Sequence, residues 1–217
     1  MNILILIIAI TAIISFVAPN GSANFEKYKF NVGAIQNRKE YIRLLSAGFL
    51  HADLMHLIFN MMALYFFGPI VVEGFGNIGF LVVYFGSILL GNIFSLFLYQ
   101  KQPWYSAIGA SGGVSGILFA SIAMIPALKI YIFFIPIGIP GFIFGLLYFS
   151  YSVYMMLNPK QHDNIGHAAH LGGAFFGLIY AIALAPGKAM ENSMYIGIMA
   201  LPLIYLSYEI FVKKKIG

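Results

Sequence analysis

The chain has 217 residues, of which 61% are hydrophobic and only 9% are Asp, Glu, Lys or Arg. Typical globular chains are roughly 45–50% apolar and 25% charged, so this chain could not cover a water-facing surface with charge. The net charge of +5 comes from 12 basic and 7 acidic residues, which reflects scarce charge rather than a basic patch. A soluble domain, a disordered chain and a nucleic-acid-binding protein are therefore excluded. The absence of Cys excludes disulfides, thiolate metal ligands and a Cys nucleophile.

The few charges divide the chain into long apolar runs. A helix needs about 20 apolar residues to cross a bilayer, and backbone groups in lipid must find partners within the protein. The runs are continuous rather than alternating, which favours helices over a β-barrel. The first run lacks the basic start of a signal peptide, so it is kept as a span. We predict an all-α polytopic membrane protein with spans at about 2–18, 53–72, 78–99, 111–127, 138–157, 167–185 and 193–212.

Two segments between the spans need a separate interpretation. Residues 19–52 are polar but also rich in aromatic and aliphatic side chains. An ordinary solvated loop is one interpretation. We prefer a loop in the membrane interface, with its aromatic side chains inward and its Lys and Arg side chains outward. The apolar segment Ile130–Pro140 is interrupted by Pro136 and Gly138, so we expect it to dip into the interface rather than to span.

Polar residues inside apolar spans are costly, so each is a candidate functional residue. His51, His56 and Asn60 stand at the start of the second predicted span. The spacing of four places His56 and Asn60 on one helix face. Taken alone, a helix–helix hydrogen bond explains these residues at least as well as a catalytic role does.

The segment Gly109–Gly116, which reads Gly-Ala-Ser-Gly-Gly-Val-Ser-Gly, opens the fourth predicted span. A structural role is possible, because Ser caps helices well and Gly112 with Gly116 forms a small packing face. A chemical role is also possible, because free backbone N–H groups at a helix start can stabilise an oxyanion beside the Ser111 hydroxyl.

His170 opens the sixth predicted span, and its spacing to Gly173 and Gly177 places all three on one helix face. A buried structural His explains the imidazole but not the two aligned glycines. Small residues beside a His let a neighbouring helix approach, which brings the imidazole close to a group on that helix.

These three groups of residues together indicate acyl transfer. Spans two, four and six run in the same direction in an alternating topology, so their starts lie on one face of the membrane. A Ser nucleophile, a His base and side-chain donors for a developing negative charge are what acyl transfer requires.

Three motifs resemble those of the rhomboid family of intramembrane serine proteases. They are the segment Arg43–Met61, the tetrapeptide Gly109-Ala110-Ser111-Gly112, and the pentapeptide Ala169-His170-Leu171-Gly172-Gly173. The match runs through about residues 1–186 in order and spacing. The resemblance implies a six-helix catalytic domain at 1–186, with an interface loop at 19–52. Residues 187–217 would then add one extra C-terminal transmembrane helix and a short basic tail.

The resemblance also implies peptide-bond hydrolysis within the membrane. Ser111 would be the nucleophile and His170 its general base and acid, with no carboxylate in a matching position to complete a triad. His56 and Asn60, with backbone N–H groups near Ser111, would form the oxyanion hole. No cofactor and no metal would be needed. The partners would be single-pass transmembrane substrate proteins within the lipid bilayer.

The chain departs from the family at two positions. The family often places an aromatic residue four positions after the nucleophile, stacked against the base His, and that position here is Ser115. We hypothesise that the Ser115 hydroxyl helps to orient His170 instead, with Gly112 and Gly173 as further support. The Trp-Arg pair common in the family's first loop appears here as Ile42-Arg43.

The orientation implied by the resemblance conflicts with the charge distribution. The family arrangement puts the N-terminus in the cytoplasm and the active site at the outer face of the cell membrane. Ten Lys and Arg residues would then lie outside and two inside, whereas the positive-inside rule favours the reverse. Either the folded first loop escapes the rule, or the last predicted span does not cross, or the orientation is inverted.

Two other functions stay open. The metalloprotease motif His-Glu-x-x-His is absent, yet a metal could in principle bind at His162, Asp163, His167 and His170. The main non-enzymatic alternative is a catalytically inactive rhomboid-like protein that binds transmembrane clients. Such proteins typically lack the Ser or the His, and both are retained here, which disfavours that alternative.

Overall fold

The computed structural model describes residues 2–132, 136–159 and 165–213, and most of them are helical. The longer helices are α1 (Ile3–Val17), α5 (Leu54–Leu98), α6 (Ser111–Met124), α7 (Gly141–Leu157), α8 (His167–Leu184) and α10 (Ser193–Ser207), which continues as a π-helical turn at Tyr208–Val212. Short helices are α2 (Ala23–Tyr28), α3 (Val32–Arg38), α4 (Arg43–Ser46) and α9 (Pro186–Glu191), with a 3₁₀ turn at Ala47–Phe49. Two antiparallel pairings join β1 (Phe30–Asn31) to β2 (Ser106–Ala107) and β3 (Lys129–Ile130) to β4 (Ile139–Pro140).

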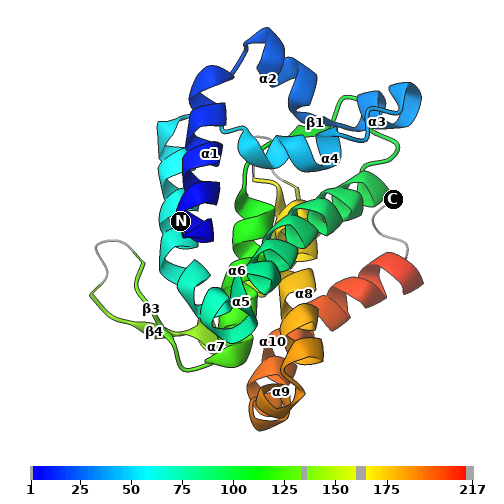
Figure 1. Cartoon of the computed structure of the whole chain (residues 1–217). Coiled ribbons are helices and arrows are strands. Elements are labelled where there is room, and N and C mark those ends of the chain that lie inside the picture. The colour runs from blue at the N-terminus through cyan, green and yellow to red at the C-terminus, as the bar shows by residue number, and fades with distance from the viewer. Residues whose placement is uncertain (1, 133–135, 160–164, 214–217) are drawn as a thin grey trace.

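The all-α membrane architecture is confirmed. Among the described residues, α5, α8 and α10 with its π-helical turn are long and apolar enough to cross a membrane, and α1, α6 and α7 are shorter apolar helices. The second and third predicted spans are joined in α5, which breaks at Gly76 with φ 70° and ψ 178°. A positive φ of this size is favourable only for glycine. Figure 1 shows the two parts of α5 running in different directions on either side of the break.

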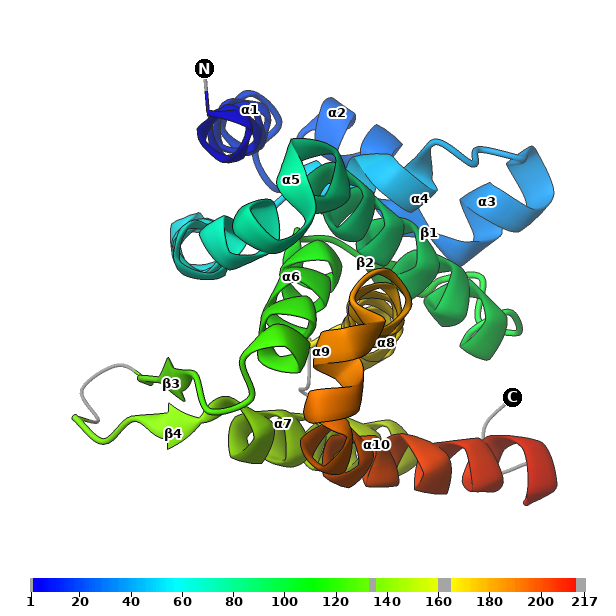
Figure 2. The same ribbon diagram turned by 60° about the horizontal axis from the view of Figure 1, so that its bottom comes forward.

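Helix α6 is the centre of the molecule. Every residue from Gly112 to Ala123 is buried, and α5 and α8 pack against it (Figure 2). Its 14 residues give a length of roughly 21 Å, which is less than the hydrocarbon thickness of about 30 Å. Helix α6 alone is therefore too short to cross the hydrocarbon core, and the packed helices around it supply partners that lipid cannot.

Glycines allow α6 and α8 to approach each other closely. A Cβ added at Gly173 would lie 2.1 Å from the carbonyl oxygen of Gly112, and one at Gly177 would lie 2.0 Å from that of Gly116. No side chain fits at either position, so the two backbones are in direct contact. This is the close approach expected from the spacing of small residues. In lipid such packing drives helix association, since apolar side chains gain little by leaving an apolar solvent.

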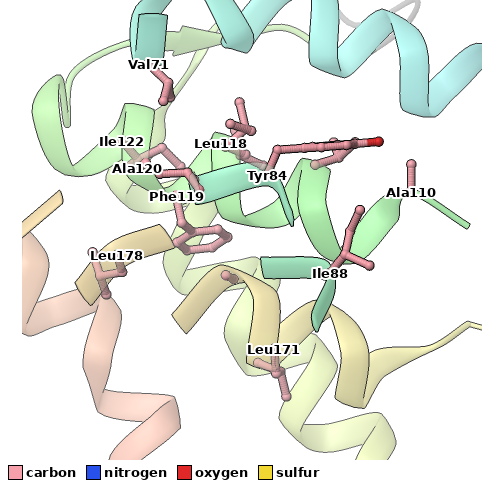
Figure 3. Close-up of a cluster of buried hydrophobic side chains, with 14 of the residues drawn as sticks. Val71, Tyr84, Ile88, Ala110, Leu118, Phe119, Ala120, Ile122, Leu171 and Leu178 are labelled. Carbon is pink, nitrogen blue, oxygen red and sulfur yellow. The ribbon is translucent and has the colours of Figure 1, made fainter. Parts of the chain in front are cut away.

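A cluster of buried side chains fills the remaining space between α5, α6 and α8 (Figure 3). Tyr84 of α5, Phe119 of α6 and Leu171 of α8 are among its largest fully buried members. Phe119 also stacks on Phe149, with ring centroids 4.2 Å apart, which connects α7 to the same core.

The first loop corresponds only partly to the interface loop expected at 19–52. Phe25 and Phe30 are buried as expected, whereas Tyr41 is 57% exposed. The expectation of outward Lys and Arg side chains is wrong for Arg43, which is only 4% exposed. A buried guanidinium needs several partners, and the fold of this loop supplies them.

Arg43 is held by the loop's own backbone and one carboxylate. Its guanidinium donates to the carbonyl oxygens of Glu26 and Lys29 and forms a 2.6 Å ion pair with Glu40. Hydrogen bonds from Arg38 and Arg43 lower the pKa of the Glu40 carboxyl to about 2. The first loop is therefore a folded unit whose parts Arg43 ties together.

Segment Ile130–Pro140 begins and ends in the β3–β4 pairing, in which Ile130 faces Ile139. Its described residues form no helix, which agrees with the expectation that it does not span. Residues 133–135 lie outside the described part of the chain.

The contact between α6 and α8 can be tested by adding a single methyl group. We expect Gly177→Ala to lower the midpoint of thermal unfolding in detergent, because its Cβ would meet the Gly116 carbonyl. The cost should be at least the ~1–3 kcal/mol typical of overpacking. The matched control is Gly197→Ala in α10, where no atom lies within 4 Å of the added Cβ. Equal midpoints for the two variants would show that the helices do not depend on this contact.

Candidate active site

The structure brings the predicted nucleophile and base together. Ser111 is the first residue of α6, and His170 lies in the first turn of α8. The Ser111 Oγ and the His170 Nε2 are 2.5 Å apart, although the residues are 59 positions apart in the chain. This distance permits direct proton transfer between hydroxyl and imidazole. The nearest backbone contact of the two helices joins Gly112, directly after Ser111, to Gly173, three residues after His170.

His56 lies against the loop that precedes the nucleophile. Gly109 has a φ of 113°, and a Cβ added there would lie 2.7 Å from the His56 Nε2 and 3.7 Å from the Ser111 Oγ. A larger residue at Gly109 would therefore displace the His56 ring. Asn60 is buried one turn further along α5, and its Nδ2 donates to the His56 carbonyl oxygen at 3.0 Å.

The first loop holds the nucleophile loop in place through backbone contacts. Phe30 pairs with Ala107 in the β1–β2 ladder, and the Gly109 N–H donates to the Ala47 carbonyl oxygen at 3.0 Å. Asn92 of α5 supports the first loop, because its Nδ2 donates to the Leu44 carbonyl oxygen at 2.8 Å. The segment before Ser111 is thus fixed by the loop at 19–52 rather than by its own helix.

His51 links α1 to the nucleophile loop, a role that the sequence did not reveal. The Ser15 hydroxyl donates to the Phe49 carbonyl oxygen at 2.8 Å and lies 2.9 Å from the His51 Nδ1. The Ala110 N–H donates to the His51 Nε2 at 3.4 Å. This chain of bonds requires a neutral imidazole protonated at Nδ1. Burial, and to a smaller extent the charge of His56, lower the pKa of His51 to about 3, which keeps it neutral.

Ser115 and His170 both contact Tyr148, which no sequence motif marks. The Ser115 Oγ lies 2.8 Å from the Tyr148 Oη. The Tyr148 ring is nearly parallel to the His170 ring, with an interplanar angle of 22° and centroids 6.3 Å apart. Tyr148 belongs to α7, so the aromatic neighbour of the His comes from a different helix than in the family pattern.

A cavity lies beside Ser111 between α5, α6, α8 and the loops before them. It is lined mainly by small and apolar residues, with Ser111 and Asn92 as its polar side chains. The cavity has room for water next to the Ser111 side chain.

The residues considered as metal ligands are only partly described. His167 and His170 have ring centroids 6.4 Å apart, and His170 already contacts Ser111. His162 and Asp163 lie outside the described residues. Within residues 2–132, 136–159 and 165–213, no group of three or more His, Asp or Glu side chains is placed to hold a metal ion.

Residues 38–187 match the Rhomboid domain family. RHOMBOID-like protein 12, mitochondrial, from Arabidopsis thaliana is 29% identical over 161 residues, or 67% of this chain and 47% of the relative. Rhomboid protein 1, mitochondrial, from Saccharomyces cerevisiae is 31% identical over 155 residues, which cover 70% of this chain and 43% of the relative. The putative rhomboid protease YdcA from Bacillus subtilis is 35% identical over 97 residues, which cover 44% of this chain and 46% of the relative. The chain spans about half the length of these relatives.

The neutral state of His51 predicts a pH-dependent stability. Its pKa in the folded protein is about 3, whereas the ordinary value is about 6.5. The unfolded state therefore binds the additional proton, and stability falls as the pH drops through this window, by up to about 1.4 kcal/mol per pH unit. We expect the thermal midpoint to fall less in His51→Gln than in the wild type between pH 6.5 and 5. Glu40 stays ionised in that range, and identical slopes would contradict this role of His51.

Proposed function

Because the chain belongs to the rhomboid family, we propose that it is an intramembrane serine protease with a Ser–His dyad. The observation that carries the proposal is the 2.5 Å contact between the Ser111 Oγ and the His170 Nε2. The short length of α6 agrees with this proposal, because a helix shorter than the hydrocarbon core leaves room for reactive groups at its N-terminus to lie within the bilayer. The proposed substrates are peptide bonds of single-pass transmembrane proteins.

The proposed reaction has two steps. His170 removes the proton of the Ser111 hydroxyl while the Oγ attacks the scissile carbonyl carbon. The imidazolium then gives that proton to the leaving amine as the peptide bond breaks, which leaves an acyl group on Ser111. In the second step, water loses a proton to His170 and attacks the acyl carbon, and the Ser111 Oγ leaves with that proton. The cavity beside Ser111 is the proposed source of this water.

The negative charge of each tetrahedral intermediate needs donors. We assign this role to His56, Asn60 and the first backbone N–H groups of α6. Support comes from the position of His56 against Gly109 and from the N-terminus of α6, which has no side-chain cap. Free N–H groups at a helix start, with the helix dipole, favour an oxyanion there. In soluble proteases, one such donor contributes about 10²–10³ to kcat.

A transmembrane substrate must unwind locally before it can react. Helical backbone carbonyls are already hydrogen-bonded and surrounded by side chains. We therefore propose that cleavage occurs near the membrane-proximal end of a substrate helix, where Gly, Pro or other weak helix formers lower the cost of unwinding. The catalytic unit is proposed to be residues 1–186, with 187–217 as an additional C-terminal helix and tail.

The alternative is an inactive rhomboid-like protein that binds transmembrane clients. It requires no contact between a Ser and a His, so the Ser111–His170 contact favours the protease. Both functions would use the same membrane-embedded architecture. Only the chemical step separates them.

Cleavage of a model transmembrane substrate tests the proposed reaction. In liposomes, the wild type should release both fragments, whereas Ser111→Ala and His170→Ala should each reduce kcat by at least about 10⁴, because catalytic residues that act as a unit lose most of their effect when one is removed. The control is Ser207→Ala, because Ser207 is exposed and its hydroxyl donates to the Leu203 carbonyl oxygen of its own helix. Equal cleavage by all four proteins would rule out the protease.

We also propose that the protein lies in the cell membrane with the Ser111 face outward. Three of the five basic residues in the first loop, Lys29, Arg38 and Arg43, form ion pairs within that loop. Their attraction to anionic lipids of the inner leaflet is correspondingly reduced. A protease-sensitive tag placed after Gly217 should be cut from outside intact cells. A tag accessible only after lysis would contradict seven spans in this orientation.

A further inference from the structure

Tyr148 lies beside His170, where the family pattern has an aromatic residue from four positions after the nucleophile. The position four residues after the nucleophile is Ser115, which is too short to reach across the imidazole as a ring would. The Tyr148 ring lies nearly parallel to the His170 ring, and its hydroxyl is tied to Ser115 at 2.8 Å. Ser115 therefore holds the tyrosine that replaces the aromatic residue of the family pattern.

The helix that carries Tyr148 depends on the C-terminal helix for its packing. Helix α7 packs more extensively on α10 than on α6 or α8. Met199 of α10 is fully buried, and a Cβ added at Gly145 would lie 2.5 Å from its sulfur. Gly145 precedes Tyr148 by one helical turn, so Met199 packs directly beside the turn that presents the tyrosine. Phe142 and Tyr195 make a second contact, with ring centroids 4.8 Å apart.

We propose that Tyr148 is a positioning residue for His170 and that α10 sets its position by holding α7. The inference rests on the proposed protease function. Proton transfer requires the His170 imidazole to keep its orientation toward Ser111, and the Tyr148 ring lies beside it. Tyr148 limits rotation of the imidazole away from Ser111, and its hydrogen bond to Ser115 fixes the tyrosine in turn. The extra C-terminal helix thereby acts on the dyad although it contributes no reacting group.

Removing the Tyr148 ring should affect activity more than removing its hydroxyl, because the ring borders His170 whereas the hydroxyl bonds to Ser115. Tyr148→Phe keeps the ring and loses the bond to Ser115, so activity should fall only slightly, as it should in Ser115→Ala. Tyr148→Leu removes the ring and should slow the reaction roughly 3- to 10-fold, the range expected from the loss of one aromatic contact. Met199→Ala loosens α7 and should slow the reaction by a similar or smaller factor.

The rate at which a fluorophosphonate labels Ser111 measures the dyad without a transmembrane substrate. We would determine the second-order rate constant in detergent for the full-length wild type and each variant, together with kcat and KM for a model substrate. Thermal midpoints would be measured in parallel. The matched control is Tyr154→Leu, which removes an exposed ring from the same helix. The labelling rate and kcat should fall in Tyr148→Leu with KM unchanged, and both should recover in Tyr148→Phe.

The double variant Tyr148→Leu/Met199→Ala tests whether α10 acts through the tyrosine. If it does, Met199→Ala should slow labelling in the wild-type background and have no further effect once Tyr148 is gone. Independent effects of the two changes would overturn the role of α10. A labelling rate in Tyr148→Leu equal to that of Tyr154→Leu would overturn the role of Tyr148 while leaving the protease intact. A wild type that is neither labelled nor active would overturn the proposed function and this inference with it.

Discussion

The direct backbone contact between α6 and α8 is the constraint on which the candidate site depends. At Gly112–Gly173 and Gly116–Gly177 no Cβ fits between the helices. Next to the first of these contacts, the Ser111 Oγ lies 2.5 Å from the His170 Nε2. A displacement of about 1 Å would break that contact, and misplacement of this size can cost 10²-fold in rate. In lipid, where hydrophobic burial cannot press helices together, small residues are the means of fixing such a distance.

The remaining elements fix the groups around this contact. The first loop secures the nucleophile loop through Ala47, and it is itself secured by the buried Arg43. His51 bonds to the backbone just before Ser111 and connects it to α1. On the opposite side, Tyr148 borders His170 from α7, which α10 supports. Helices α1, α7 and α10 and the first loop therefore contribute to the geometry of Ser111 and His170, although only α6 and α8 carry these two residues.

The charge pattern alone predicted the ends of most helices to within a few residues, because charged side chains are costly in lipid and therefore mark where spans end. The spacing of His170, Gly173 and Gly177 also predicted a close helix contact, since this information is local. The burial of Arg43 was not predictable in the same way. Its partners are backbone carbonyls of residues 26 and 29, and only the folded loop brings these into reach. Tyr148 was missed for a related reason, because contacts between helices distant in the chain leave no spacing in the sequence.

Mapping the position of a covalent fluorophosphonate adduct tests the Ser111–His170 dyad most directly. After labelling of the full-length protein and digestion, mass spectrometry of the peptides should place the adduct on Ser111. The same peptide should remain unmodified in His170→Ala, because without the base the hydroxyl is a poor nucleophile. Neighbouring Ser115 should stay unmodified in both proteins. An adduct on another serine, or equal modification of Ser111 with and without His170, would contradict the dyad.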